Sequence, residues 1–215
     1  MGRVICNVTS VNPLPSRWGF FFETKIRSFS GDTLNKILMD VSTVKRSLER
    51  IAHEIIEGNR DMGFILVGIH TRGVYLAQRI STNIAKYEGY RIPVGKLDPV
   101  LYRDDKKTQL LSSLKSSQLD FDINEKTIIL VDDVLYTGRT IRASMEALLS
   151  YGRAKVVQVA VLIDRGHREL PVRADYVGKN IPTTKDEKVK VKVMEVDGVD
   201  LVELLPEAGT IKGQK

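Results

Sequence analysis

Two adjacent carboxylates, Asp132 and Asp133, close an apolar run and precede a loop that contains Thr137, Gly138 and Thr140. Ionised carboxylates only accept hydrogen bonds, so the pair suits the two donor hydroxyls of a ribose. The loop offers a phosphate the backbone N–H groups of a helix start, a glycine that permits close approach and two hydroxyl donors. A Mg²⁺ ion near the acids would offset their charge. The alternative, in which the acids only end a strand and cap a helix, explains the flanking residues less well.

A second loop, Thr71-Arg72-Gly73, follows the apolar run Phe64–Ile69. Its arginine and backbone donors could hold a diphosphate, although the tripeptide alone is more typical of a simple turn. A third segment, Leu101–Asp105, opens a polar stretch that extends to about Glu125. That length exceeds an ordinary connection and predicts a mobile loop or a β-arm.

The segment Asp164–Pro182 combines a strand exit, a turn and a basic connection that ends at a proline. His167 lies within it, but a positioned surface or core imidazole is commoner than a catalytic base, and we assign it no catalytic role.

Strands and helices alternate around these loops. Apolar residues at three- and four-residue spacing predict a first helix that starts at Asp40 or Ser42 and stops at Gly58-Asn59. The other expected elements are strands over 64–69, 94–102, 127–131 and 156–163, and helices over 74–84 and 139–151. This alternation indicates an α/β fold, a parallel sheet flanked by helices, in which ligands lie outside the carboxyl ends of the strands. The alternating residues Lys188–Val193 predict a strand at an edge or in a small subdomain.

The composition is typical of a soluble globular protein, with 42% hydrophobic and 28% charged residues. No run approaches the ~20 apolar residues of a membrane span, and the first residues lack the apolar core of a secretory signal, so we expect a cytoplasmic protein. The net charge of +6 and the pI of about 9.3 favour an anionic partner, a phosphorylated substrate or nucleic acid, although an ordinary basic surface fits them as well. The single Cys6 supports no internal disulfide.

The 215 residues suit one α/β domain, which we place at residues 36–205, with a flexible tail over 206–215. Residues 1–35 have no sustained period and form an irregular extension, either disordered or an artefact of start-site choice, with Met39 as the alternative start. Their aromatic run, Trp18–Phe22, could instead dock on the body or on a second subunit.

Five segments together resemble the PyrR family, the bifunctional pyrimidine-operon regulators and uracil phosphoribosyltransferases of the type I phosphoribosyltransferase superfamily. The segments are Arg50–Ile56, Val67–Gly73, Leu101–Asp105, Ile128–Thr140 and Asp164–Pro182, and the resemblance covers roughly residues 36–197. Residues 128–140 match the phosphoribosyl pyrophosphate signature of the superfamily, and residues 164–182 mark this member of it.

The resemblance implies a type I phosphoribosyltransferase fold, a parallel sheet flanked by helices with a small hood. It implies that uracil and phosphoribosyl pyrophosphate give UMP and pyrophosphate with Mg²⁺. Carried over by position, the catalytic residues are Asp132 and Asp133, which hold the ribose hydroxyls near the Mg²⁺ of the diphosphate, and Arg103 on a closing arm. The hood segment over 181–189 contacts uracil. The residues expected to bind phosphoribosyl pyrophosphate or the nucleotide are Thr71, Arg72, Ile128, Ile129, Leu130, Val131, Asp132, Asp133, Val134, Leu135, Tyr136, Thr137, Gly138, Arg139, Thr140, Arg165 and Val189.

Members of the family also bind a messenger RNA leader when UMP is bound and promote transcription attenuation, and they tend to form dimers and higher homo-oligomers. The residues that would meet RNA here are Arg46, Arg50, His53, Arg173 and Lys179. A solvated helix face is the alternative. The chain departs from the family at Glu49, where a small hydroxyl residue is common, and at Gly58, where an arginine is common.

Three other functions share these motifs. A purine phosphoribosyltransferase would carry the same loops over 71–73 and 128–140, although residues 164–182 favour uracil. An enzyme without any RNA role fits the departures at Glu49 and Gly58. A non-catalytic sensor of phosphoribosyl pyrophosphate that binds DNA would need a helix-turn-helix domain, for which residues 1–35 look too short and irregular.

Overall fold

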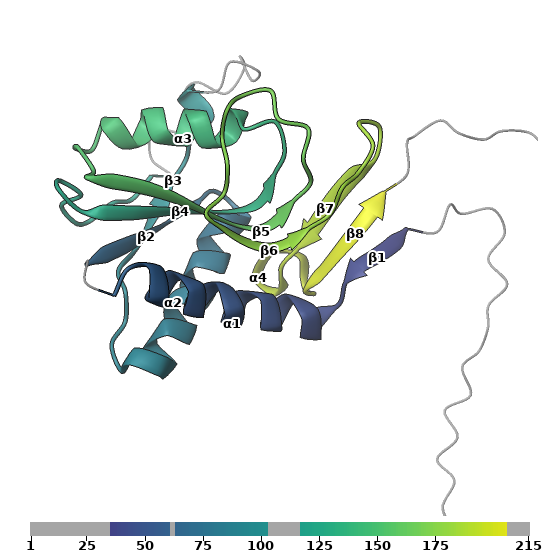
Figure 1. Ribbon diagram of the computed structural model, residues 1–215, viewed down its shortest axis with the longest axis horizontal. Helices are drawn as coiled ribbons and strands as arrows, with labels where there is room; N and C mark the ends of the chain where they lie inside the picture. The colour runs from purple at the N-terminus through teal and green to yellow at the C-terminus, as the bar shows by residue number, and fades with distance from the viewer. Residues whose placement is uncertain (1–34, 61–62, 103–116, 206–215) are drawn as a thin grey trace, which may run out of the picture. The chain divides into compact units, whose positions relative to one another are not determined.

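The computed structural model describes residues 35–60, 63–102 and 117–205, drawn as ribbons in Figure 1. The predictions for residues 1–34, for the tail from residue 206, and for Arg103 with most of the polar arm lie outside these ranges. Within the described ranges, no helix has both the length and the apolar character that a membrane crossing demands.

Five strands form a parallel sheet in the order β3-β2-β4-β5-β6. Their bounds are Val94–Leu97 (β3), Phe64–Ile69 (β2), Thr127–Leu135 (β4), Val156–Asp164 (β5) and Tyr176–Asn180 (β6). The neighbouring strands β2 and β4 are almost entirely buried, as expected for apolar runs with both faces covered. The predicted parallel α/β sheet is therefore confirmed.

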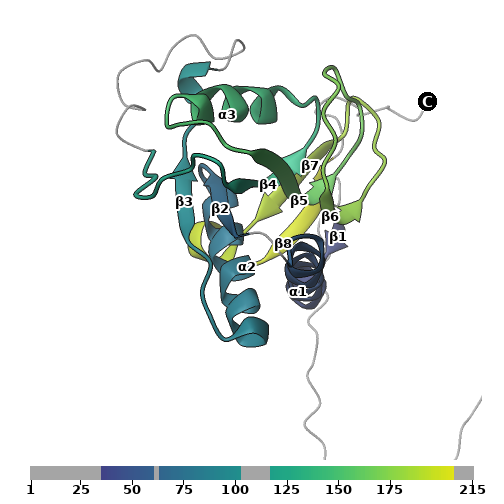
Figure 2. The ribbon, with the colours of Figure 1, turned by 60° about the vertical axis from the view of Figure 1, so that its left-hand side comes forward.

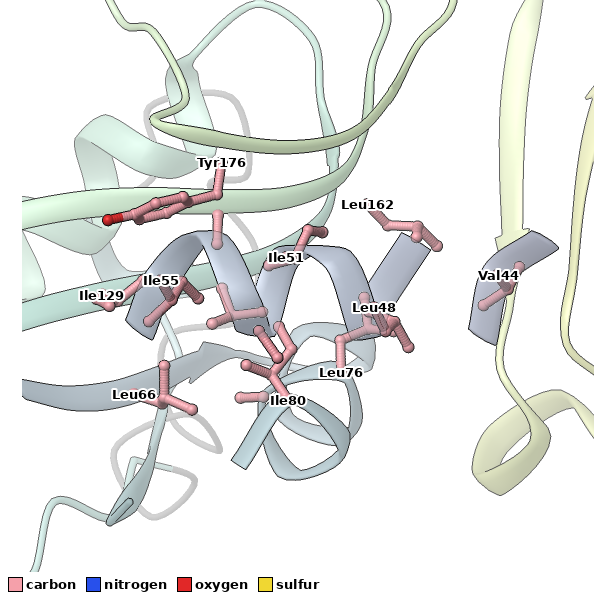
Figure 3. Close-up of a cluster of buried hydrophobic side chains, with 14 of the residues drawn as sticks. Val44, Leu48, Ile51, Ile55, Leu66, Leu76, Ile80, Ile129, Leu162 and Tyr176 are labelled. Carbon is pink, nitrogen blue, oxygen red and sulfur yellow. The ribbon is translucent and has the colours of Figure 1, made fainter. Parts of the chain in front are cut away.

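Helices cover both faces of this sheet. The helices α1 (Val41–Gly58) and α2 (Arg72–Glu88) lie on one face and α3 (Arg139–Leu149) on the other (Figures 1 and 2). The Asp40 side chain accepts a hydrogen bond from the Thr43 N–H at 2.8 Å, so Asp40 and not Ser42 caps the start of α1. The apolar face predicted for α1 packs against α2 and the sheet, with Ile51 and Ile55 at its centre (Figure 3).

A second, antiparallel sheet of three strands in the order β1-β8-β7 forms the hood. Its strands are Lys36–Met39 (β1), Leu201–Leu205 (β8) and Lys188–Lys192 (β7), and the short helix α4 (Met194–Asp197) precedes β8. The strand predicted near Lys188–Val193 is thus confirmed as β7. Met39, the alternative start, is the last residue of β1, and a chain that began there would lack the rest of this strand.

The strand β6 lies inside the segment over 164–182 that the sequence interpretation treated as a connection. Its sequence, with Gly178 followed by two polar residues, has no alternating pattern that would reveal a strand. A Cβ at Gly178 would lie 2.4 Å from the Leu162 carbonyl oxygen, so the close contact of the backbones of β5 and β6 requires the glycine.

The third expected strand is shorter than predicted. It ends at Leu97, and a 3₁₀ turn, η1 (Val100–Tyr102), follows instead of a strand that extends to residue 102. The Asp98 carboxylate accepts the Val100 N–H at 3.0 Å, which turns the chain out of the sheet.

Candidate active site

The two loops predicted to hold phosphate groups follow neighbouring strands. The chain after β2 enters α2 on one face of the sheet, whereas the chain after β4 enters α3 on the other face (Figure 1). In open α/β sheets, ligands bind at such a switch point, outside the carboxyl ends of the strands. The fold therefore brings Thr71–Gly73 and Tyr136–Gly138 to the same end of the sheet.

Two glycines allow the loop after β2 to lie in backbone contact with β4. A Cβ at Gly73 would lie 2.3 Å from the Val131 carbonyl oxygen and 3.2 Å from the Asp132 Cα. A Cβ at Gly68, within β2, would lie 2.4 Å from the Val74 Cα. A side chain at either position would push the first turn of α2 away from the strands, so these glycines set the spacing between the loop and the two acids.

Asp132 is buried and Asp133 is half-buried near the end of β4. Asp132 is 8% exposed, and its Oδ1 accepts the Asp133 N–H at 2.9 Å. The Asp133 Oδ1 accepts the Val134 N–H at 2.9 Å. Burial raises the pKa of Asp133, while the hydrogen bond with Asp132 and the charge of Arg72 oppose the rise. Hydroxyl donors or a nearby cation would stabilise the ionised form of such a carboxylate, and the predicted contact with the ribose hydroxyls would supply such donors.

The loop after β4 is shaped to present backbone N–H groups. Gly138 has a φ of +92°, in the left-handed region that favours glycine, and α3 begins directly after it. The Thr137 carbonyl oxygen accepts the N–H groups of Glu169 at 3.0 Å and Leu170 at 3.2 Å, and its Oγ1 accepts the Arg139 N–H at 3.4 Å. The positive end of the α3 dipole faces this loop, as a phosphate site requires.

The apolar residues of the predicted signature, at positions 128–131, 134 and 135, pack in the protein interior. The side chains of Ile128, Ile129, Leu130, Val131 and Leu135 are buried in the two hydrophobic cores, and Val134 is half-buried. These residues position the loop, and the groups left to face a ligand belong to the residues around them, including the half-buried Thr137 and Thr140.

Sequence reasoning gave Arg168 no role, yet its guanidinium ties the loop after β4 to the loop after β5. Its Nη1 donates to the carbonyl oxygens of Tyr136 at 2.7 Å and Gly166 at 3.1 Å, and its Nε donates to that of Val172 at 3.0 Å. Its Nη2 pairs with the Asp164 carboxylate. The four-residue spacing of Asp164 and Arg168 was a visible signal for the ion pair, but backbone carbonyl partners leave no mark in a sequence.

Arg165 joins the same loop to the segment that leads to the hood. It is 6% exposed, and its guanidinium carbon lies 4.0 Å from the centroid of the Tyr136 ring. It donates to the Thr183 Oγ1 at 3.0 Å and to the Glu187 carbonyl oxygen at 2.7 Å. The predicted place of Arg165 near the substrate therefore corresponds to a buried link between the phosphate loop and the segment over 183–187.

A pocket of about 590 Å³ adjoins Arg165 at the carboxyl ends of β5 and β6. Residues 164–168 and 180–183 line it, and the Thr183 carbonyl oxygen accepts a hydrogen bond from the His167 Nε2. The segment over 181–189 predicted to contact uracil thus contributes its first residues to this pocket. Val189 lies in β7, packs against the core and is not among the lining residues.

The Arg72 side chain points to the hood. Its Nε and Nη2 donate to both oxygens of Asp197 in α4, at 3.0 and 2.9 Å, and the hydrogen bond lowers the pKa of that carboxyl. The Thr71 Oγ1 lies 3.0 Å from the His70 Nδ1. Arg72 therefore fixes α2 to the hood beside Asp133, and a contact of its guanidinium with a diphosphate stays a prediction.

Four of the five residues predicted to meet RNA lie on α1 and the neighbouring edge strand β6. The Arg50 Nη2 donates to the Gly178 carbonyl oxygen at 2.5 Å, and its Nη1 pairs with Glu54. The Lys179 Nζ donates to the Leu38 carbonyl oxygen at 3.0 Å. The His53 ring packs on the Tyr87 ring of α2, with 3.9 Å between centroids. We call this region, with Arg46 and Glu49, the α1–β6 surface. Arg173 lies between β5 and β6.

Gly58 has a structural correlate as well. A Cβ there would lie 2.8 Å from the Tyr176 hydroxyl oxygen, so a longer residue requires this ring to move. The hydroxyl is held by the Asn59 Nδ2 at 3.0 Å and donates to the Gln158 Oε1 at 3.2 Å. The departure at Gly58 is therefore matched to the packing of Tyr176.

Comparison with known proteins gives this site its class. The phosphoribosyl transferase domain family matches residues 31–197. A crystal structure of a hypoxanthine phosphoribosyltransferase from Staphylococcus aureus is similar, with a TM-score of 0.59 at 19% identity, and the match covers 78% of this chain and 90% of that one. The fold is that of a type I phosphoribosyltransferase.

Sequence relatives narrow the class to one family. The chain is 55% identical over 174 residues to the bifunctional protein PyrR of Thermus aquaticus, covering 80% of this chain and 96% of that protein. It is 58% identical over 169 residues to the bifunctional protein PyrR of Alkaliphilus metalliredigens, covering 78% and 93%. The chain belongs to the PyrR family, as the five motifs of its sequence predicted.

Proposed function

We propose that this protein is a uracil phosphoribosyltransferase that also regulates pyrimidine biosynthesis genes by UMP-responsive binding to a messenger RNA leader. The observation that carries the enzymatic half is the placement of Asp132 and Asp133 beside two loops predicted to bind anions, at the switch point of the sheet. Membership of the PyrR family supports both halves.

In this proposal each group of the site has one task. Asp132 and Asp133 accept the ribose hydroxyls, and the loop from Tyr136 to Thr140 holds the 5-phosphate with backbone donors at the start of α3. The loop from Thr71 to Gly73 holds the diphosphate. Positive charge that develops at the sugar carbon is stabilised by nearby carboxylates, and the departing diphosphate by N–H donors. Arg103, on the arm, would add its charge to that end.

The pocket beside Arg165 is the proposed site of the base. Its walls offer backbone groups of residues 164–168 and 180–183, which suit the alternating donors and acceptors of a uracil edge. The cation–π contact of Arg165 with Tyr136 connects this pocket to the phosphate loop. The pocket could therefore hold the base while the connected phosphate loop holds the 5-phosphate of the same nucleotide.

The residues present fit a Mg²⁺ ion that arrives with the substrate. The described residues contain no cluster of three or more histidine, cysteine or acidic side chains that would bind a metal by itself. Mg²⁺ usually keeps waters and needs only one or two carboxylates together with substrate phosphate oxygens. Asp132 and Asp133 would supply those carboxylates, and the ion would neutralise charge on the diphosphate.

A panel of bases tests the enzymatic half. The purified protein, phosphoribosyl pyrophosphate and Mg²⁺ are mixed with uracil, hypoxanthine or guanine, and release of pyrophosphate is measured. We expect turnover with uracil alone. Turnover with a purine and none with uracil would support the second candidate, a purine phosphoribosyltransferase.

A gel shift with the transcript of the gene's own leader tests the regulatory half. The α1–β6 surface carries the side chains proposed to meet phosphates, Arg46, Arg50 and Lys179 among them. We expect binding that UMP strengthens and salt weakens. An absence of binding at low salt in both states would leave an enzyme without an RNA role. That the protein forms a homo-oligomer and lies in the cytoplasm is part of the proposal.

A further inference from the structure

A large pocket lies at the opposite end of the sheet from the proposed active site. Its volume is about 760 Å³, and its lining includes Phe64, the first residue of β2, and Pro93, which directly precedes β3. These positions are at the amino ends of the strands, whereas the phosphate loops follow their carboxyl ends. The pocket is therefore separate from the catalytic groups, and its size suits a small molecule or one nucleotide.

A buried amide gives this pocket an unsatisfied acceptor. Asn59 lines the pocket, is 3% exposed, and its Oδ1 has no hydrogen-bond partner among the described residues. Its Nδ2 donates to the Ile55 carbonyl oxygen at 2.9 Å and to the Tyr176 hydroxyl at 3.0 Å, so the orientation of the amide is fixed. A buried acceptor without a donor is rare in folded proteins. The Oδ1 atom itself is covered by protein, so an N–H or O–H group of a ligand would reach it after a small shift of the pocket wall.

Cations and an aromatic ring surround the same pocket. Arg60 and Arg91 line it, and neither guanidinium has a hydrogen bond or ion pair with another described residue. Tyr90 also lines it, and this side chain is 57% exposed. A planar base can stack on such a ring, and a phosphate can pair with the arginines. Ile56 and Ile92 add an apolar wall. Acceptor, stacking ring and cations together match an unpaired nucleotide.

The pocket continues the α1–β6 surface. The helix α1 carries Arg50 and His53, then Ile56 at the pocket about one turn later, and Asn59 follows directly after its last residue. The His53 ring packs on Tyr87, which is 45% exposed and lies three residues before Tyr90. The exposed rings of Tyr87, beside His53, and of Tyr90, at the pocket, are therefore only three residues apart in the chain.

We infer that this pocket binds one unpaired nucleotide, its base stacked on Tyr90 with a donor toward Asn59 and its phosphate on Arg60 and Arg91. The nucleotide is either part of the bound RNA or a free nucleoside monophosphate. The RNA source rests on the proposed regulatory function, and the free source does not.

Binding measurements on four variants test the inference. Tyr90→Ala and Arg91→Ala remove the stacking ring and one cation, and Tyr151→Ala and Arg153→Ala are matched controls at the far end of α3. All four side chains are exposed, and none belongs to the proposed catalytic groups, so uracil turnover serves as the check of folding. The probes are the labelled leader transcript and AMP, GMP, CMP and UMP, with Kd measured at low salt and phosphoribosyl pyrophosphate present.

Two results support the inference. In the first, Tyr90→Ala and Arg91→Ala each weaken transcript binding about tenfold while the controls bind as the unaltered protein does. In the second, a monophosphate binds in addition to phosphoribosyl pyrophosphate, and the two pocket variants lose this binding.

Unchanged binding of every probe by the pocket variants overturns the inference, and the regulatory proposal then survives if the transcript still binds. If the unaltered protein binds no transcript, the regulatory proposal is wrong. In that case the monophosphate result alone supports or overturns the pocket.

Discussion

The catalytic end of the sheet and the α1–β6 surface differ in what holds their residues. At the catalytic end, a Cβ at Gly73 would meet the Val131 carbonyl oxygen at 2.3 Å, and Arg168 donates to four backbone carbonyls. On the α1–β6 surface, the Arg50 guanidinium holds edge-strand carbonyls, but Arg46 and His53 are exposed side chains on a helix.

This difference indicates that substitutions have different structural effects in the two regions. A substitution among the backbone-packed groups of the catalytic end displaces a loop, whereas one at an exposed side chain of the α1–β6 surface, such as Arg46, changes mainly local charge. The two departures from the family, Glu49 and Gly58, both lie on α1. The enzymatic function is therefore the better protected of the two proposed functions.

The largest effect is expected at Asp133. Asp133→Asn keeps the size of the side chain but removes a charge that accepts ribose hydroxyls, so turnover should fall roughly 10²- to 10³-fold. A steady-state pyrophosphate-release assay measures this, with Asp122→Asn, in an exposed turn before β4, as the control. Turnover within a few-fold of the unaltered protein would falsify the assignment of Asp133 as a catalytic residue.

The next effect probes the loop itself. Arg168→Ala leaves the Tyr136 and Val172 carbonyls without their donor, and we expect the free energy of unfolding to fall by about 2–3 kcal/mol. The phosphate loop should loosen as well, raising the KM for phosphoribosyl pyrophosphate roughly tenfold. Denaturant unfolding and kinetics measure the two effects, and Arg153→Ala is the control. A large loss of stability with an unchanged KM would mean that the Arg168 contacts stabilise the fold but do not position the phosphate loop.

Much of this contrast could be predicted from the sequence. The apolar runs of β2 and β4, the carboxylates after them and Gly138 were recognisable because burial, charge and chain flexibility restrict residue type. The Arg168 clamp and β6 were missed. Backbone carbonyls accept hydrogen bonds whatever side chain they belong to, and Gly178 is in β6 because of its contact with Leu162, which is distant in sequence.

The pocket beside Tyr90 was missed for a related reason. Its lining comes from α1, the start of β2, the end of α2 and the residues before β3, and no motif joins them. Nothing in the sequence indicated that the Arg72 guanidinium pairs with Asp197, which lies 125 residues further along the chain.

A smaller effect concerns pH. Burial raises the pKa of Asp133 above 3.8, the value in the unfolded chain, so the folded state favours the protonated form. The contribution of the Asp133 carboxyl to the free energy of unfolding is fully present below pH 3.8. It is lost as the pH rises through the pKa that this carboxyl has in the folded state. Asp133→Asn should therefore unfold like the unaltered protein at low pH and be the more stable of the two at neutral pH. Chemical denaturation at several pH values measures this, and an equal offset at every pH would contradict it.

The smallest effect belongs to the α1–β6 surface. Glu49 lies three residues after Arg46 and four before His53, on the same side of α1, and opposes the approach of a phosphate. A like charge about 7 Å from a phosphate in water costs roughly 0.6 kcal/mol, so Glu49→Ser should tighten transcript binding about threefold. The gain should vanish at high salt, because exposed charges are screened, and Glu146→Ser on α3 should show none. A plot of log Kd against log salt for the three proteins measures it. Equal affinities at low salt would place the RNA contact away from Glu49 and reduce α1 to a solvated helix face.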